Sequence, residues 1–200
     1  MSFESYRSIA QVIEEFQITA IDRDFLEPFP LEISEAFRED LAFSLQAFNV
    51  DDSEYGVCEA VIFPILKTIY RNYYDAFVLW SHKMLTYDSN LTGVPDYILA
   101  SRSPLSKTIF KQPYFVAIEA KRDDFIKGWG QCLAELVAIQ KLNANPDQVI
   151  YGIVCNGQLW QFGMLHQQTF TKNMTSYTVS DLDRLMAAVN ALFKRCSLAI

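Results

Sequence analysis

Apolar residues along the chain follow two spacings, one typical of amphipathic helices and one typical of strands. The helical spacing predicts helices over residues 5–18, 34–48, 54–74, 122–142 and 180–196. Continuous or alternating apolar runs predict strands over residues 76–87, 93–99, 115–121, 148–155 and 158–165. Because the central helix connects the third and fourth strands, this order predicts an α/β or α+β sandwich built on a mixed sheet of about five strands.

Local signals mark where several of these elements begin or bend. Ser34 is a favourable N-cap for the second helix, and the run from Asp51 to Glu54 offers side-chain oxygens to the first amides of the third. Pro64 removes one backbone hydrogen bond and is expected to kink that helix. Asn156-Gly157 predicts a tight type I′ hairpin between the last two strands.

The predicted elements form one domain. Residues 1–52 supply two helices with acidic faces, which we expect to cover the molecule as an N-terminal helical layer. Residues 53–165 contain the core, and residues 178–197 end the chain in an amphipathic helix. The 200 residues are 50% hydrophobic, enough for a sizeable core.

Composition limits the cellular setting. No apolar run approaches the roughly 18 residues of a membrane span, and the first residues lack a basic segment followed by an apolar core. These features predict an intracellular, cytoplasmic protein. The cysteines are widely spaced and predicted to be buried, reduced thiols: Cys58, Cys132, Cys155 and Cys196.

Charge is unevenly distributed. The chain carries a formal charge of −7, which disfavours broad contact with nucleic-acid phosphates. Residues 1–59 hold three basic residues against fourteen acidic ones, whereas residues 101–127 hold six against three. We therefore expect positive potential near the third strand and an N-terminal third turned away from any polyanion.

The third strand ends in two charged residues. Side chains alternate across a strand, so Phe115, Ala117, Glu119 and Lys121 are expected on one face. Burying a carboxylate and an amine is unfavourable unless they pair or bind something. When the stretch is considered alone, a salt bridge where the strand meets water is the more ordinary explanation of this pair.

Asp96, at the start of the second strand, adds a second carboxylate. If the second and third strands are antiparallel neighbours, Asp96 and Glu119 converge at one edge of the sheet, with the Lys121 amine beside them. Hard oxygen ligands of this kind suit Mg²⁺ or Mn²⁺. Such a site would serve phosphodiester hydrolysis, with Lys121 orienting water or stabilising negative charge.

Pro95-Asp96, the triplet Glu119-Ala120-Lys121 and a following helix with Gln131 resemble the PD-(D/E)XK nuclease superfamily of restriction-endonuclease-like folds. The resemblance spans about residues 54–165, and the hairpin over 154–162 is similar to that of the nuclease domain of type I restriction enzyme motor subunits. It implies that Asp96, Glu119 and the Ala120 carbonyl bind the metal and that Lys121 is the catalytic amine. It further implies that Glu59 is either an additional metal carboxylate or a carboxylate that supports the metal ligands, and that Gln131 contacts water, the lysine or the nucleic-acid backbone.

Three functions follow. The first is a Mg²⁺-dependent endonuclease acting on DNA rather than RNA, possible as a homodimer because cutting both strands needs two sites. The second is a catalytically inactive fold of the same kind that serves as a protein-interaction module, which the acidity favours. The third, an enzyme acting on a small phosphorylated substrate, lacks a glycine-rich phosphate loop. Trp129, between two glycines, is the best tryptophan for base stacking, and neither His82 nor His166 suggests catalysis.

Overall fold

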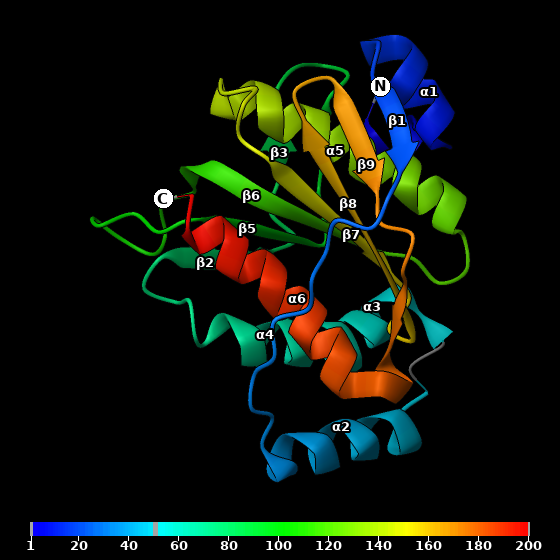
Figure 1. Ribbon diagram of the computed structural model, residues 1–200, viewed down its shortest axis with the longest axis vertical. Helices are drawn as coiled ribbons and strands as arrows, with labels where there is room; N and C mark the ends of the chain where they lie inside the picture. Colours follow the sequence, from blue (N-terminus) through cyan, green and yellow to red (C-terminus); the bar gives the residue numbers. More distant parts are fainter. Residues whose placement is uncertain (1, 50–51, 200) are drawn as a thin grey trace.

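The computed structural model describes residues 2–49 and 52–199, and within these residues the chain builds a mixed sheet of eight strands (Figure 1). The order along the sheet is β1-β9-β8-β7-β6-β5-β2, and β10 pairs with β8. The strands are β1 (Thr19–Asp22), β2 (Phe77–Ser81), β5 (Tyr97–Ser101), β6 (Lys111–Ala120), β7 (Ile150–Cys155), β8 (Leu159–His166), β9 (Thr169–Lys172) and β10 (Tyr177–Thr178). A separate short hairpin joins β3 (Leu85–Thr86) to β4 (Thr92–Gly93). The predicted mixed α/β architecture is confirmed, but the expectation of about five strands was too low.

The three central strands have the pairing that the sequence predicts. β5 runs antiparallel to β6, with Tyr97 opposite Ile118. β6 runs parallel to β7, which α5 (Phe125–Asn143) makes possible by crossing from one strand to the other. These pairings place the start of β5, the end of β6 and the start of α5 close together, at the same end of the strands.

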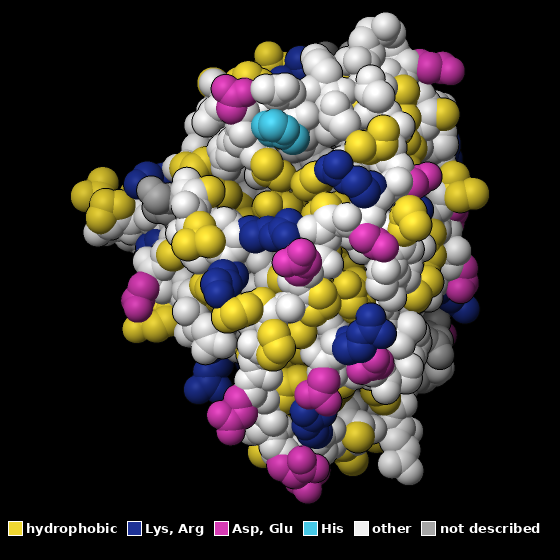
Figure 2. All heavy atoms as spheres, viewed as in Figure 1, with side chains coloured by type: hydrophobic (Ala, Val, Ile, Leu, Met, Phe, Trp, Pro, Cys, Tyr) yellow, Lys and Arg dark blue, Asp and Glu magenta, His cyan; other side chains and the backbone are white. Residues whose placement is uncertain are grey.

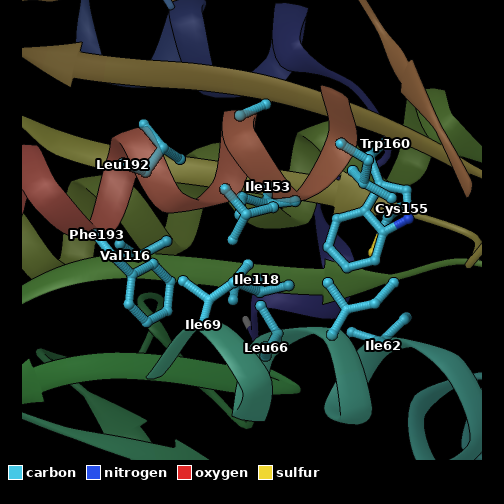
Figure 3. Packing of buried hydrophobic residues seen from close by; sticks show 14 of the residues in the cluster. Ile62, Leu66, Ile69, Val116, Ile118, Ile153, Cys155, Trp160, Leu192 and Phe193 are labelled. Carbon is cyan, nitrogen blue, oxygen red and sulfur yellow. The ribbon is translucent and has the colours of Figure 1, made fainter. Parts of the chain in front are cut away.

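Helices cover both faces of the sheet (Figure 1). α5 packs on one face together with α1 (Ile9–Phe16). α6 (Leu182–Ser197) and α4 (Phe63–Tyr70) pack on the other. Figure 3 shows the core between the sheet and α4 with α6. Side chains from α4, β6, β7 and α6 point toward one another there, including Ile69, Val116, Ile153 and Phe193. All four cysteines are buried free thiols, as predicted.

The N-terminal residues do not form one covering layer. α1 lies against α5, whereas α2 (Glu35–Ala47) packs on the opposite side, against the helix that precedes α4. Between them β1, which the sequence analysis missed, pairs in parallel with β9 at the edge of the sheet. The predicted N-cap of α2 is confirmed, since the Ser34 side chain accepts a hydrogen bond from the amide of Phe37.

The helix predicted over residues 54–74 is built from three segments. It begins as α3 (Glu54–Val57), continues as a π-helical turn, η3 (Cys58–Ile62), and ends as α4. Ser53 caps its start by accepting from the amide of Gly56; Asp51 lies outside the described residues. Pro64 follows the π turn directly and lacks the amide that regular helical bonding needs, which accounts for an interruption at this point.

Two local predictions were wrong in detail. Phe115 packs with Val116 on the α4 and α6 side rather than with Ala117, because the pairing of β5 with β6 shifts register here and Phe115 is the extra residue. The β7–β8 hairpin exists, but only Gly157 has positive φ (+83°) among the described residues of its turn, so the turn is not type I′. The Asn156 side chain instead accepts from the amides of Gln158 and Leu159.

Gly128 and Gly130 both lie inside α5 rather than in the loop before it. Residues 128–139 of α5 are all buried, because the sheet covers one side and α1 with η1 (Phe3–Ser5) covers the other. A Cβ at Gly130 would lie 2.6 Å from the amide nitrogen of Ser8. Glycine is therefore required for the N-terminal segment to approach α5 this closely.

Candidate active site

A cavity of about 340 Å³ lies at the end of the sheet where β5 starts and β6 ends. Asp96 directly precedes β5, Glu119 lies in β6, Lys121 directly follows β6, and α5 contributes Gln131 and Glu135. The other lining residues are Ser2, Phe3, Glu4, Glu54, Tyr55, His82, Gly93 and Val94. Four of the residues predicted from the sequence, Asp96, Glu119, Lys121 and Gln131, therefore share one cavity.

Asp96 is fixed by its neighbours on two strands. Its Oδ2 accepts a hydrogen bond of 2.7 Å from the amide of Ala120, which ties the start of β5 to the end of β6. Its Oδ1 lies 3.3 Å from His82 Nε2, just after β2. Burial raises the pKa of Asp96, although the Ala120 hydrogen bond and the charge of Lys121 oppose that shift.

Glu119 and Lys121 form a buried ion pair, with Lys121 Nζ 2.8 Å from Glu119 Oε1. Glu119 is 4% exposed and Lys121 9% exposed. Burial and the nearby charge of Asp96 raise the pKa of Glu119 to about 7. Burial alone would lower the pKa of Lys121, but the charge of Glu119 and their hydrogen bond outweigh it and leave that pKa above its usual value, so the amine is protonated.

Glu135 brings a third carboxyl group into this cluster. Burial and the charge of Glu119 raise the pKa of Glu135 well above its usual value, and the hydrogen bond between the two carboxyl groups favours a proton held between them. Two oxygens on successive turns of α5, Gln131 Oε1 and Glu135 Oε2, are buried without a hydrogen-bond partner among the described residues. Buried polar atoms are rarely left unpaired, and these two line the cavity, where a ligand or its water could satisfy them.

The first turn of α5 leaves room for Lys121. A Cβ on Gly128 would lie 2.8 Å from Lys121 Cγ and 2.8 Å from Val154 Cγ1. Asp124 begins this helix by accepting a hydrogen bond from the amide of Lys127. The glycine therefore allows the lysine stem to pass between helix and sheet and deliver its ammonium group to the cavity.

Glu59 and Trp129 do not join this arrangement. Glu59 is exposed and lines two neighbouring hollows, whereas Glu54, one turn earlier, lines the cavity with Oε2 3.6 Å from Lys121 Nζ. Trp129 is 1% exposed inside α5, and its indole nitrogen donates to Gln161, so it is not available for base stacking. The expectation that the N-terminal third avoids the site was also wrong, because Glu4 and Glu54 line it.

The donor set suits a hard cation that keeps part of its water shell. Across residues 2–49 and 52–199, no group of three or more His, Cys, Asp or Glu side chains is arranged to hold a metal ion. Mg²⁺ commonly uses one or two protein carboxylates and takes its other ligands from water and substrate phosphate. Asp96 and Glu119 supply such a pair, and the unpaired oxygens of Gln131 and Glu135 could accept hydrogen bonds from coordinated water.

No protein-family model and no curated protein matches this chain. Within the described residues, no helix is both long and apolar enough to span a membrane. What the site does must therefore be argued from its own chemistry.

The cavity residues that sequence reasoning missed include Glu54, His82 and Glu135. Glu135 follows Gln131 by one helical turn, and that spacing on a buried helix was an available signal. Glu54 had been assigned only to the start of a helix. His82 carried no signal, because its approach to Asp96 depends on its positive φ (49°) and on the pairing of β2 with β5.

Proposed function

We propose that this chain is a divalent-cation-dependent nuclease of the PD-(D/E)XK type that hydrolyses phosphodiester bonds in DNA. The observation that carries the proposal is the meeting of Asp96, Glu119 and Lys121 in one cavity with two unpaired buried oxygens. The order of elements supports it further. An aspartate before a strand, the acid-x-lysine triplet on the antiparallel neighbour, a helix with Gln131 and a β-hairpin follow one another as in that family.

In this proposal, Asp96, Glu119 and the main-chain oxygen of Ala120 hold Mg²⁺ or Mn²⁺. The bound cation supplies Lewis-acid activation of the phosphodiester. A water oxygen attacks phosphorus and that water releases a proton to solvent, the bond from phosphorus to one bridging sugar oxygen breaks, and the departing oxygen takes up a proton from solvent. Lys121, a buried ammonium group, stabilises the negative charge that develops on the phosphoryl oxygens.

The residues of α5 position these groups. Glu135 holds a proton against Glu119 and so fixes the direction of that carboxylate. The Gln131 side chain faces the same space and accepts a hydrogen bond from water that approaches the phosphate. Glu54 lies on the solvent side of Lys121, and its ion pair with the ammonium group holds that group in position.

A cleavage assay tests the proposal. The protein is incubated with supercoiled plasmid and with end-labelled single-stranded DNA, in Mg²⁺, in Mn²⁺ and in EDTA. We expect cleavage that requires the divalent cation and that falls at least about 100-fold in Lys121→Ala and in Glu119→Gln. Glu14→Ala and Lys141→Ala, which change exposed residues away from the cavity, should retain activity. Absence of cleavage under every condition, or cleavage equal in all variants, contradicts the proposal.

A catalytically inactive protein-interaction module is the second candidate, favoured by one observation. Lys121 is ion-paired with both Glu119 and Glu54, which a purely structural network would also require. The response of thermal unfolding to Mg²⁺ distinguishes the two. A ligand that binds only the folded state raises the melting temperature. We expect that rise in the unmodified protein and its loss in Glu119→Gln, whereas a structural ion pair would give no rise in either.

A further inference from the structure

A second hollow, of about 220 Å³, adjoins the candidate active site. Four rings line it: Tyr55 from α3, Phe63 from α4, His82 after β2 and Tyr97 from β5. Cys58, Glu59 and Ser81 complete its wall. Tyr55 and His82 line both spaces, so the hollow lies directly beside the cavity that holds Asp96 and Glu119.

The four rings form a connected series. Tyr55 lies 5.8 Å from His82 between ring centroids, His82 lies 6.0 Å from Tyr97, and Tyr97 stacks on Phe63 at 6.1 Å with an interplanar angle of 15°. The two ends of the series remain open to solvent, since Tyr55 is 69% exposed and Phe63 38% exposed. Exposed aromatic faces beside a polar site offer stacking surface to a flat ligand.

The π-helical turn brings the two exposed rings together. Tyr55 and Phe63 are eight residues apart, a spacing that in a regular α-helix would turn them about 80° from each other. The turn η3 accommodates one additional residue, so the pair behaves like positions i and i+7, which share a face. This interruption of the helix therefore shapes the hollow.

The inner rings are fixed by hydrogen bonds. His82 Nδ1 lies 2.8 Å from Ser81 Oγ, and its other ring nitrogen faces Asp96. The hydroxyl group of Tyr97 donates to the carbonyl oxygen of Cys58 at 3.3 Å. The wall is thus preorganised, and its link to Asp96 couples the hollow to the candidate catalytic carboxylate.

Charge indicates which part of a nucleic acid fits here. Glu59 lines the hollow, so the negative charge of a phosphate would be repelled from it. A nucleobase is flat, aromatic and uncharged, and its amino groups can donate to a carboxylate such as Glu59. In a duplex both faces of each base are covered by neighbouring pairs, so only an unpaired base can stack on these rings.

We propose that the hollow lined by Tyr55, Phe63, His82 and Tyr97 binds an unpaired nucleobase of the substrate, adjacent to the phosphodiester held in the cavity. The inference rests on the proposed nuclease function and narrows its substrate to single-stranded nucleic acid, or to duplexes with a locally unpaired nucleotide. It also gives exposed Glu59 a role in base contact rather than in metal binding.

Binding measurements that need no cleavage test this proposal. Single-stranded oligonucleotides containing 2-aminopurine are titrated with the Lys121→Ala protein in Mg²⁺, and fluorescence and anisotropy are recorded. We expect quenching of 2-aminopurine on binding, and affinity lowered about 5- to 150-fold when Tyr55→Ala is added, the range for loss of one base stack. Tyr55→Phe, which keeps the ring, should bind normally. Tyr74→Ala, which removes an exposed ring outside both hollows, is the matched control.

The outcomes separate this inference from the proposed function. Stacking without cleavage by the unmodified protein supports the base site and refutes hydrolysis. Cleavage with unchanged affinity and quenching in Tyr55→Ala refutes the base site and leaves hydrolysis standing. Equal loss of affinity for fully paired duplex and for single strands would also overturn the base site, because Tyr55 would then contact backbone. So would the absence of oligonucleotide binding.

Discussion

Glu119 and Glu135 are two carboxyl groups in contact inside a space that holds one protonated amine. Lys121 balances one negative charge, and the pKa of Glu119 is raised to about 7 while that of Glu135 is raised well above its usual value. The folded protein therefore retains protons on these side chains at a pH where the unfolded chain has released them.

This retention predicts a pH dependence of stability. Because the folded pKa values lie above the unfolded ones, the stabilisation is full below about pH 4.5, the usual pKa of glutamate, and is lost as pH rises through about 7. For each proton that the folded state holds and the unfolded state does not, the free energy of unfolding falls by ~1.4 kcal/mol for every unit by which the pH rises. We expect urea unfolding in EDTA to show lower stability at pH 8 than at pH 5.5.

Glu135→Gln tests the origin of that slope. The amide of glutamine can still donate to Glu119 but cannot ionise, so the variant should lose stability less steeply between pH 5.5 and pH 8. Glu14→Gln, an exposed substitution on α1, should keep the slope of the unmodified protein. A slope unchanged in Glu135→Gln would show that the buried pair is not its source.

Residue types and strand alternation were enough to predict that Asp96, Glu119 and Lys121 would meet. These residues lie in or beside two paired strands, and the pairing of the strands fixes which of their residues are neighbours in space. It was not predictable in this way that Glu54, rather than Glu59, lines the cavity. It depends on how α3 and η3 rotate against the sheet, which tertiary packing sets.

At the level of elements, long and strongly patterned segments were predictable and short edge strands were not. β6, α5, β7 and α6 carry continuous or periodic apolar signals. β1 is exposed along its whole length, so no alternation marks it, and it exists because β9 offers it an edge. The bulge at Phe115 likewise depends on packing across the sheet rather than on local sequence.

The junction of α5 with β6 yields a prediction at the same scale. Gly128→Ala would place a methyl group 2.8 Å from both the Lys121 stem and Val154, so one of them must move. Overpacking of this kind costs about 1–3 kcal/mol, partly offset by the ~1 kcal/mol gain in helix propensity. We expect a modest loss of stability in urea unfolding, with a much larger fall in Mg²⁺-dependent cleavage because the ammonium group is displaced.

Gly152→Ala is the matched control for this substitution. Its added methyl group would lie 2.9 Å from Cys132 Sγ, in the core below α5 and away from Lys121. It should destabilise the protein to a similar degree while cleavage by the folded fraction stays near normal. Equal activity loss in both variants would show that α5 packing, rather than the lysine position, limits catalysis.

The whole molecule is acidic, and this limits how it can hold a polyanion. Its formal charge is −7, and on the face shown in Figure 2 Lys and Arg side chains lie interspersed with Asp and Glu. In the proposed site, Glu4, Glu54 and Glu59 add negative charge around a single buried lysine. Affinity for nucleic acid should then come from the bound cation and base stacking more than from contacts with phosphates.

This division of affinity predicts a weak salt dependence. For single strands the slope of log affinity against log salt is about −0.7 per neutralised phosphate, so two contacts would give about a sevenfold loss between 50 and 200 mM KCl. Anisotropy titrations of Lys121→Ala in constant Mg²⁺ measure this slope. Tyr55→Ala should lower the affinity without changing the slope of log affinity against log salt, because stacking releases no counterions. A loss of about 300-fold or more, as six or more phosphate contacts would produce on a single strand, would instead require an extended basic surface.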